Sequence, residues 1–140
     1  MTQVDFYVLD ENTEHQVENV ACRLAEKAMQ GGSRIYLCCQ NDEQTKLLDK
    51  LLWEFRDSSF LPHATDESDS EAPIGLGTAR APDHFHDILI NLSGQIPEGY
   101  ARFERILELV PADHQSREAS RNNFSHYRDR GYPLKKHDIR

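Results

Sequence analysis

Short, almost unbroken apolar segments recur along this chain, and the first of them are separated by stretches of helical periodicity. Residues 34–39 and 87–92 are the clearest of these segments, and each is long enough for one strand. A strand that is buried on both faces reads as continuously apolar, which is typical of parallel sheets covered by helices. The alternation of strand and helix therefore predicts an α/β fold with a mostly parallel sheet and helices on both faces.

The remaining elements follow from periodicity and from helix-capping signals. A helix should begin near Thr13, which forms a plausible capping box with Gln16, and end at Gly31 and Gly32. Asn41 or Asp42 can cap the second helix. The other expected elements are a first strand at residues 4–10, a short edge strand at 74–78, a turn or short helix at 96–103, the last strand at 105–110 and a C-terminal helix at about 113–130.

Length and composition limit the class of protein. A chain of 140 residues is expected to form one domain, residues 1–140, interrupted by an acidic, serine-rich loop at about 64–73. Three cysteines without a spacing pattern indicate reduced thiols and a cytoplasmic location. We find no signal-peptide pattern and no apolar run that could span a membrane.

The charge of the chain is unevenly distributed. The net charge of −8 argues against bulk binding of nucleic acid, which depends on clustered Lys and Arg. Residues 117–140, however, carry seven basic side chains against three acidic ones. This end of the chain is therefore the part suited to meet an anion.

The C-terminal helix carries a stripe of cations and aromatic rings. Arg117, Arg121, Phe124, Tyr127 and Arg128 fall along one side of a helix. Guanidinium groups bind carboxylates through a planar fork, and aromatic walls can hold an apolar side chain beside them. The stripe thus fits an acidic peptide or its terminal carboxylate. The same pattern also fits an ordinary amphipathic helix whose rings are core and whose arginines are solvated.

A second apolar group follows the second helix. Trp53, which is the only Trp, and Phe60 lie near the end of that helix and in its exit segment. Trp and Phe are typical anchors of protein interfaces, although both residues are also common in protein cores.

Signals for catalysis are weaker. Gly75 and Gly77 lack the third glycine of a dinucleotide fingerprint, and the residues after them do not begin a helix. His84 and His86 have no third metal ligand at convincing spacing, and Cys38 and Cys39 read as small hydrophobic residues within a strand. We therefore expect no catalytic residue, no metal and no cofactor.

Taken in order, several segments resemble the chi subunit of bacterial DNA polymerase III holoenzyme, over nearly the whole chain. They are residues 6–9, Leu52-Trp53 followed by residues 59–63, residues 87–92, the Val110-Pro111 step and residues 127–132. The resemblance implies a Rossmann-like fold without nucleotide chemistry, and a non-catalytic accessory role in DNA replication. It also implies a cytoplasmic location, in the nucleoid-associated replisome of a bacterium.

The resemblance further implies two partners. One is psi, the subunit that tethers chi to the clamp loader, at Trp53 and Phe60, where an alternative helicase partner could also bind. The other is the acidic C-terminal tail of single-stranded-DNA-binding protein, at Val110, Arg117, Arg121, Phe124, Tyr127 and Arg128, with Tyr127 among the walls of the pocket. DNA contact should be indirect or weak. Two alternatives remain: a nucleotide-binding enzyme of Rossmann type, and a weak single-stranded-DNA-binding module.

Overall fold

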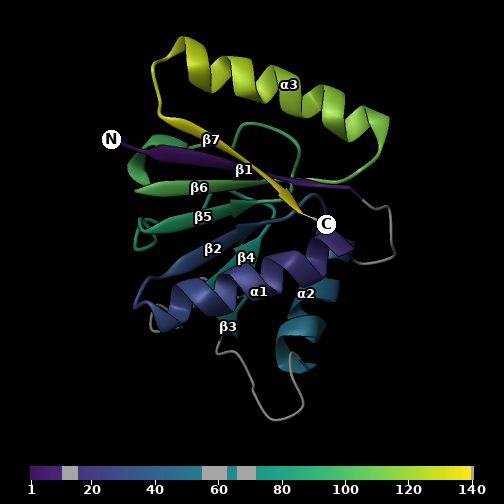
Figure 1. Ribbon diagram of the computed structural model, residues 1–140. Coiled ribbons are helices and arrows are strands. Elements are labelled where there is room, and N and C mark those ends of the chain that lie inside the picture. Colours follow the sequence, from purple (N-terminus) through teal and green to yellow (C-terminus); the bar gives the residue numbers. More distant parts are fainter. Residues whose placement is uncertain (11–15, 55–62, 66–71, 140) are drawn as a thin grey trace.

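The strands form one parallel sheet (Figure 1). The computed structural model describes residues 1–10, 16–54, 63–65 and 72–139. Within these residues the strand order is β3-β4-β2-β5-β6-β1-β7, and every pairing between neighbours is parallel. The strands are β1 (Gln3–Leu9), β2 (Ile35–Cys38), β3 (His63–Ala64), β4 (Ile74–Gly77), β5 (Ile88–Asn91), β6 (Arg105–Val110) and β7 (Leu134–Ile139).

Helices cover both faces of the sheet, which confirms the predicted fold class. The helices α1 (Gln16–Gln30) and α2 (Asp42–Glu54) lie on one face, and α3 (His114–Asp129) lies on the other (Figure 1). A short 3-10 helix, η1 (Tyr100–Arg102), stands where a turn or short helix was expected. No helix of the described ranges is long and apolar enough to cross a membrane.

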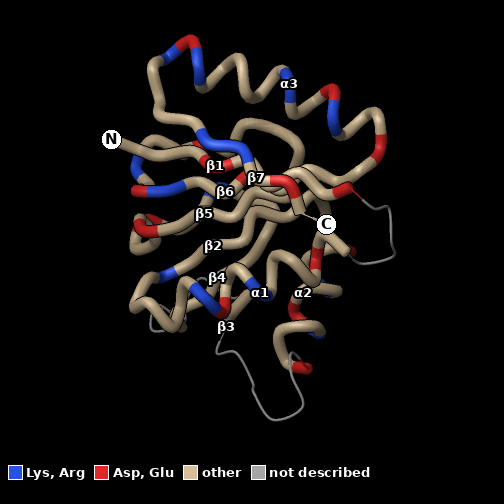
Figure 2. The backbone as a smooth tube through the Cα atoms, viewed as in Figure 1, with Lys and Arg blue, Asp and Glu red and all other residues tan. Residues whose placement is uncertain are grey.

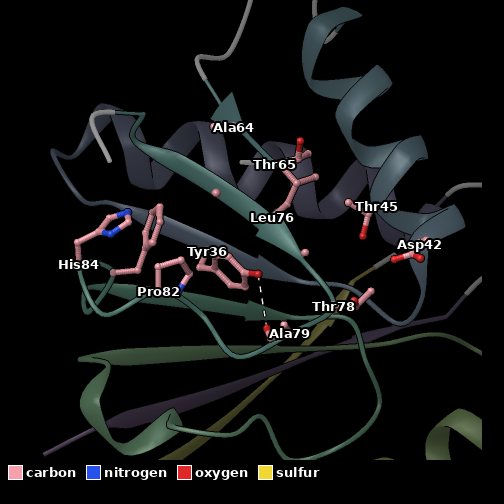
Figure 3. Close-up of a pocket in the computed structure, with 13 residues that line it drawn as sticks. Tyr36, Asp42, Thr45, Ala64, Thr65, Leu76, Thr78, Ala79, Pro82 and His84 are labelled. Carbon is pink, nitrogen blue, oxygen red and sulfur yellow. Dashed lines mark hydrogen bonds between the residues drawn. The ribbon is translucent and has the colours of Figure 1, made fainter. Parts of the chain in front are cut away.

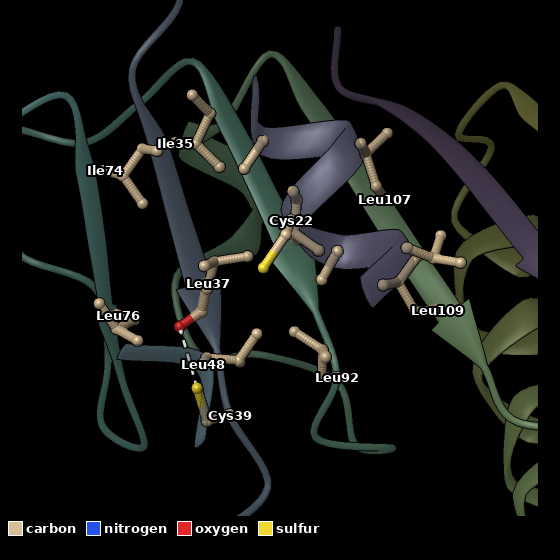
Figure 4. Packing of buried hydrophobic residues seen from close by; sticks show 14 of the residues in the cluster. Cys22, Ile35, Leu37, Cys39, Leu48, Ile74, Leu76, Leu92, Leu107 and Leu109 are labelled. Atoms are coloured by element: carbon tan, nitrogen blue, oxygen red, sulfur yellow. Dashed lines mark hydrogen bonds between the residues drawn. The ribbon is translucent and has the colours of Figure 1, made fainter. Parts of the chain in front are cut away.

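The face under α1 and α2 is closed by aliphatic side chains. Alternate residues of β2, such as Leu37, meet the apolar stripe of α1 and residues of α2 such as Leu48 (Figure 4). Cys22 lies in this layer, and burial, with a smaller contribution from the charge of Glu18, raises the pKa of its thiol to about 12. The thiol therefore behaves as a small hydrophobic group.

Local signals set the ends of the helices. Asn41 caps α2, since its side-chain oxygen accepts a hydrogen bond from the backbone N–H of Gln44 at 2.8 Å. Asp113 caps α3 in the same way through Ser116 at 2.8 Å, as the sequence predicted. Gly131 follows α3 with a φ of 80°, which a side chain would disfavour, and closes a Schellman motif with Tyr132. The Thr13 capping box lies outside the described residues.

Two strand expectations were wrong. Residues 74–78 were expected at an edge, but β4 lies between β3 and β2, because two residues of the exit segment pair with it as β3. Residues 105–110 were expected to be the last strand, yet β7 follows α3 and pairs with β1. The chain therefore ends its described part beside its own first strand, and β7 forms an edge of the sheet.

Candidate peptide-binding groove

A groove runs between α3 and the strands beneath it, and we call it the α3 groove. Its volume is about 410 Å³. The lining residues come from four elements: Phe6 and Val8 of β1, Val110 of β6, Lys136 of β7, and Arg117, Ser120, Arg121, Phe124, Ser125 and Arg128 of α3. None of these described lining residues is acidic.

The floor of the α3 groove is apolar. Phe6 and Val8 alternate along β1 toward α3, and Val110 stands on the neighbouring strand β6 in register with Val8. The ring of Phe124 leans on Phe6, with ring centroids 5.4 Å apart and the planes tilted by 54°. Phe124 is only partly buried, so its ring is shared between the core and the groove. Such a floor can take an apolar side chain of a ligand.

The wall contributed by α3 is cationic, because its lining residues include three arginines and no acidic residue. Figure 2 marks the basic and acidic positions along α3. One terminal nitrogen of Arg117 donates a hydrogen bond to the backbone carbonyl of Leu9 at 3.0 Å, while its Nε is buried without a partner. Arg121 is exposed, and its side chain makes no hydrogen bond or ion pair within the described residues. Arg128 contacts Asp129 at 3.3 Å at the surface. The wall therefore holds guanidinium donors that the described part of the protein does not satisfy, which is an arrangement suited to carboxylates.

The structure brings together five of the six residues predicted for the binding stripe. They are Val110, Arg117, Arg121, Phe124 and Arg128. Tyr127 was expected among the pocket walls, and that expectation was wrong: its side chain is 0% exposed and does not line the groove. A helix stripe spans a wide angle, and the fold turns Tyr127 into the core while leaving Phe124 at the rim.

Tyr127 instead belongs to a buried polar network under α3. Its hydroxyl donates to Oε2 of Glu108 at 2.8 Å, and the Nδ2 of Asn91 lies 2.9 Å from both oxygens of the same carboxyl group. Burial raises the pKa of Glu108 to about 7, against the opposing hydrogen bonds from Asn91 and Tyr127. Asn123 also ties α3 down, by donating to the carbonyl of Gly94 at 3.0 Å. These hydrogen bonds therefore hold α3 in position, and α3 forms one wall of the groove.

Sequence reasoning missed the groove residues that come from β1 and β7, and Ser120 on α3. Phe6 and Val8 were recognised only as part of a strand, and Lys136 only as one of the basic residues near the end of the chain. The period-2 pattern of residues 4–8 could have shown which side chains share a face. Nothing in the sequence indicated that residues 134–139 pair with that strand.

A second pocket of about 240 Å³ lies beside β4 (Figure 3). A Cβ at Gly75 would lie 2.7 Å from the ring of Phe85, and one at Gly77 would lie 2.6 Å from the hydroxyl of Tyr36. These glycines therefore let two aromatic side chains lie across β4, and they stand within a strand rather than in a turn that cradles phosphate. The described lining of this pocket contains no Lys or Arg, so it does not suit an acidic ligand.

Of the second predicted interface, only Trp53 can be placed. It lies near the end of α2 and is 60% exposed, which makes it the most exposed large aromatic side chain of the described residues. Phe60 lies outside the described residues. Trp53 and the α3 groove belong to elements on opposite faces of the sheet (Figure 1).

Comparisons with known proteins agree with the resemblance found in the sequence. The family model described as DNA polymerase III chi subunit, HolC, matches residues 1–135. A protein of Pseudomonas aeruginosa named DNA polymerase III subunit chi is 44% identical over 139 residues, covering 99% of this chain and 98% of that protein. Proteins with the same name from Haemophilus influenzae and Escherichia coli are each 27% identical over at least 95% of both chains.

Proposed function

The chain belongs to the DNA polymerase III chi subunit family, and we propose that it links the polymerase assembly to single-stranded-DNA-binding protein by holding that protein's acidic C-terminal tail in the α3 groove. Membership of the family gives the chain an accessory role in DNA replication, in association with the polymerase III complex. The finer statements about partners and residues are the proposal.

One observation carries this proposal: guanidinium donors without described partners stand over an apolar floor in the same groove. Arg121 pairs with the terminal carboxylate of the tail, and Arg117 pairs with an acidic residue that precedes it. Phe124 and Val110, together with Phe6, hold the apolar side chain at the end of the tail. Tyr127 supports this floor from inside the core and does not touch the peptide.

The strength of binding follows from the size and chemistry of the groove. A short peptide that buries one aromatic side chain and forms two charge pairs binds in the micromolar range, at about −8 kcal/mol. Part of this free energy is exposed ion pairing, so added salt weakens the complex. Many tails on one coated strand then raise the effective affinity by avidity.

A second surface completes the linking role. We place psi, and alternatively a helicase partner, at the exposed Trp53 and at Phe60, which lies outside the described residues. The chain acts without catalysis of its own in this proposal, and its contact with DNA is indirect. The described lining of the groove contributes four cations within a chain of net charge −8, which does not favour strong binding of bare DNA.

The experiment is a titration of the protein against a fluorescent peptide that copies the cognate tail, read by anisotropy at low and moderate salt. We expect micromolar, salt-sensitive binding that weakens at least tenfold in Arg121→Ala and with a peptide lacking its last residue. Trp53→Ala serves as the matched variant, because it should lose psi and keep the tail.

Two results would contradict these expectations. A folded protein that does not bind the peptide up to high micromolar concentration would contradict the tail-receptor role. Equal loss of psi and tail in Arg121→Ala would indicate a general effect on the fold rather than a local contact.

A further inference from the structure

We propose that Lys136 of β7 is a peptide-binding residue of the α3 groove, and that its ammonium group pairs with an acidic side chain on the side of the peptide that faces away from α3. This inference rests on the proposed function, because it takes an acidic peptide as the occupant of the groove. It adds a second, strand-borne cationic wall to the wall that the helix supplies.

The register of the sheet fixes where Lys136 stands. Lys136 pairs with Phe6 of β1, and the ring of Phe6 contacts the ring of Phe124 on α3. Lys136 is therefore level with Phe124 along the groove. At this level α3 offers only Phe124 and Ser125, which carry no charge, since Arg121 and Arg128 are separated by about 10 Å along the helix axis. Lys136 is thus the lining cation at a level where α3 supplies none.

The shape of an extended peptide explains why a second wall matters. Successive side chains of an extended chain point to opposite sides. Of two neighbouring acidic residues in the groove, one therefore faces α3 and its arginines, and the other faces away from them. Lys136 is the one described lining residue of β7, so it is placed to meet the second carboxylate.

Lys136 already forms an ion pair within the protein, so a peptide carboxylate would have to compete with Asp138. Its Nζ lies 3.7 Å from Oδ1 of Asp138, two residues along the same face of β7. Both side chains are more than half exposed, at 63% and 55%, so this ion pair contributes little and is readily exchanged. A peptide carboxylate can take the place of Asp138, but the negative charge of Asp138 remains beside the groove. Removing the charge of Lys136 should therefore weaken peptide binding, whereas removing the charge of Asp138 should strengthen it.

The neighbouring Lys135 provides a matched control. It lies one residue earlier in β7, carries the same charge, and is exposed, but its register partner is Asp5 and it does not line the groove. A residue one position away in a strand points to the other face of the sheet. Lys135→Gln and Lys136→Gln thus remove equal charge from nearly the same position, and only one of them removes a groove contact.

The test measures tail-peptide affinity for Lys136→Gln, Lys135→Gln and Asp138→Asn at low salt, with each variant checked for an unchanged thermal unfolding midpoint. We expect Lys136→Gln to weaken binding about twofold to fivefold and Asp138→Asn to tighten it about twofold. Lys135→Gln should change affinity by less than about 1.5-fold. The effect of Lys136→Gln should shrink as salt is added.

A second set of titrations uses peptides in which each acidic residue in turn is replaced by its amide. The loss caused by Lys136→Gln should vanish with one of these peptides and persist with the others. Equal effects of Lys135→Gln and Lys136→Gln, or the same loss with every peptide, would overturn the contact and leave only a general charge effect. That result, with Arg121→Ala still losing the tail, removes this inference alone; absence of binding by the unchanged protein removes the proposed function with it.

Discussion

The two faces of the sheet are built from different side chains and leave different surfaces. Under α1 and α2, every residue of the buried cluster is aliphatic or cysteine. Under α3, the buried cluster contains five aromatic rings and surrounds the polar network of Glu108, Asn91 and Tyr127. Among the described helices, α1 and α2 cover the first face and α3 covers the second (Figure 1). The α3 groove lies beside α3 on that second face.

If the proposed function holds, stability and recognition are divided between the two faces of the sheet. The side chains of the first buried cluster are aliphatic or cysteine and pack without a directional polar network among themselves, so that layer can serve as the core. Aromatic rings and a buried carboxyl group hold α3 in one position, and the apolar side chains of Phe6, Val8 and Val110 form the floor of the groove beside it. Three substitutions test this division, beginning with the largest expected effect.

Leu37→Ala should destabilise the aliphatic core under α1 and α2. Leu37 is fully buried at the centre of the cluster beneath α1, and its truncation leaves a cavity there. We expect a loss of about 2–5 kcal/mol in the free energy of unfolding, measured by urea denaturation. The molecules that remain folded should bind the tail peptide with unchanged affinity. A large loss of peptide affinity at native conditions would show that the two faces are not independent.

Glu108→Gln should change how the stability of the aromatic face depends on pH. The pKa of Glu108 lies at about 7 in the folded protein, above the ordinary value of 4.5, so the folded state binds the proton more tightly than the unfolded state. The stability it supports is therefore complete below about pH 4.5 and is lost as the pH rises toward 7, by about 3 kcal/mol in total.

The comparison of the two proteins isolates this group, because Cys38 and Tyr127, two ionisable groups that interact with Glu108, are present in both. Stability curves between pH 5 and 8 should converge or cross in favour of Glu108→Gln as the pH rises. Parallel curves across this window would mean that Glu108 titrates normally in the folded protein.

Tyr127→Phe should have the smallest of the three effects. The change keeps the ring and removes the hydroxyl that donates to Glu108, which leaves the carboxylate with Asn91 as its remaining described donor from a side chain. The expected cost is about 1–2 kcal/mol in the free energy of unfolding. Peptide affinity should stay within about twofold, because the hydroxyl does not reach the groove. Lost peptide binding at full stability would reinstate Tyr127 as a contact residue.

The elements predicted correctly from sequence are those with a strong local signal. The apolar runs of β2 and β5 and the capped, periodic α2 and α3 needed no tertiary information. β7 was not predicted because four of its six residues are polar, Lys135, Lys136, His137 and Asp138, so the strand lacks the alternating apolar pattern of a half-buried strand. β3 was not predicted because a strand of two residues is too short to show a periodic pattern.

The groove could be predicted only in part, for a related reason. Arg117, Arg121 and Phe124 were found because they share one helix, where spacing alone defines a face. Phe6 and Lys136 come from strands that meet α3 only through the strand order, which the sequence does not reveal. Tyr127 was misplaced because helical spacing shows which residues share a face of the helix but not which of them are buried in the core.

The position of β1 between β6 and β7 has a consequence for how the protein is made. A ribosome synthesises β1 first, yet its pairing partners lie far downstream, as the contact between Asp5 and His137, 132 positions apart, illustrates. Until those residues emerge, β1 lacks its native pairing partners, and unpaired apolar strands favour aggregation. The groove is consequently among the last parts of the fold to be completed, so the proposed peptide binding requires that β7 has already paired with β1.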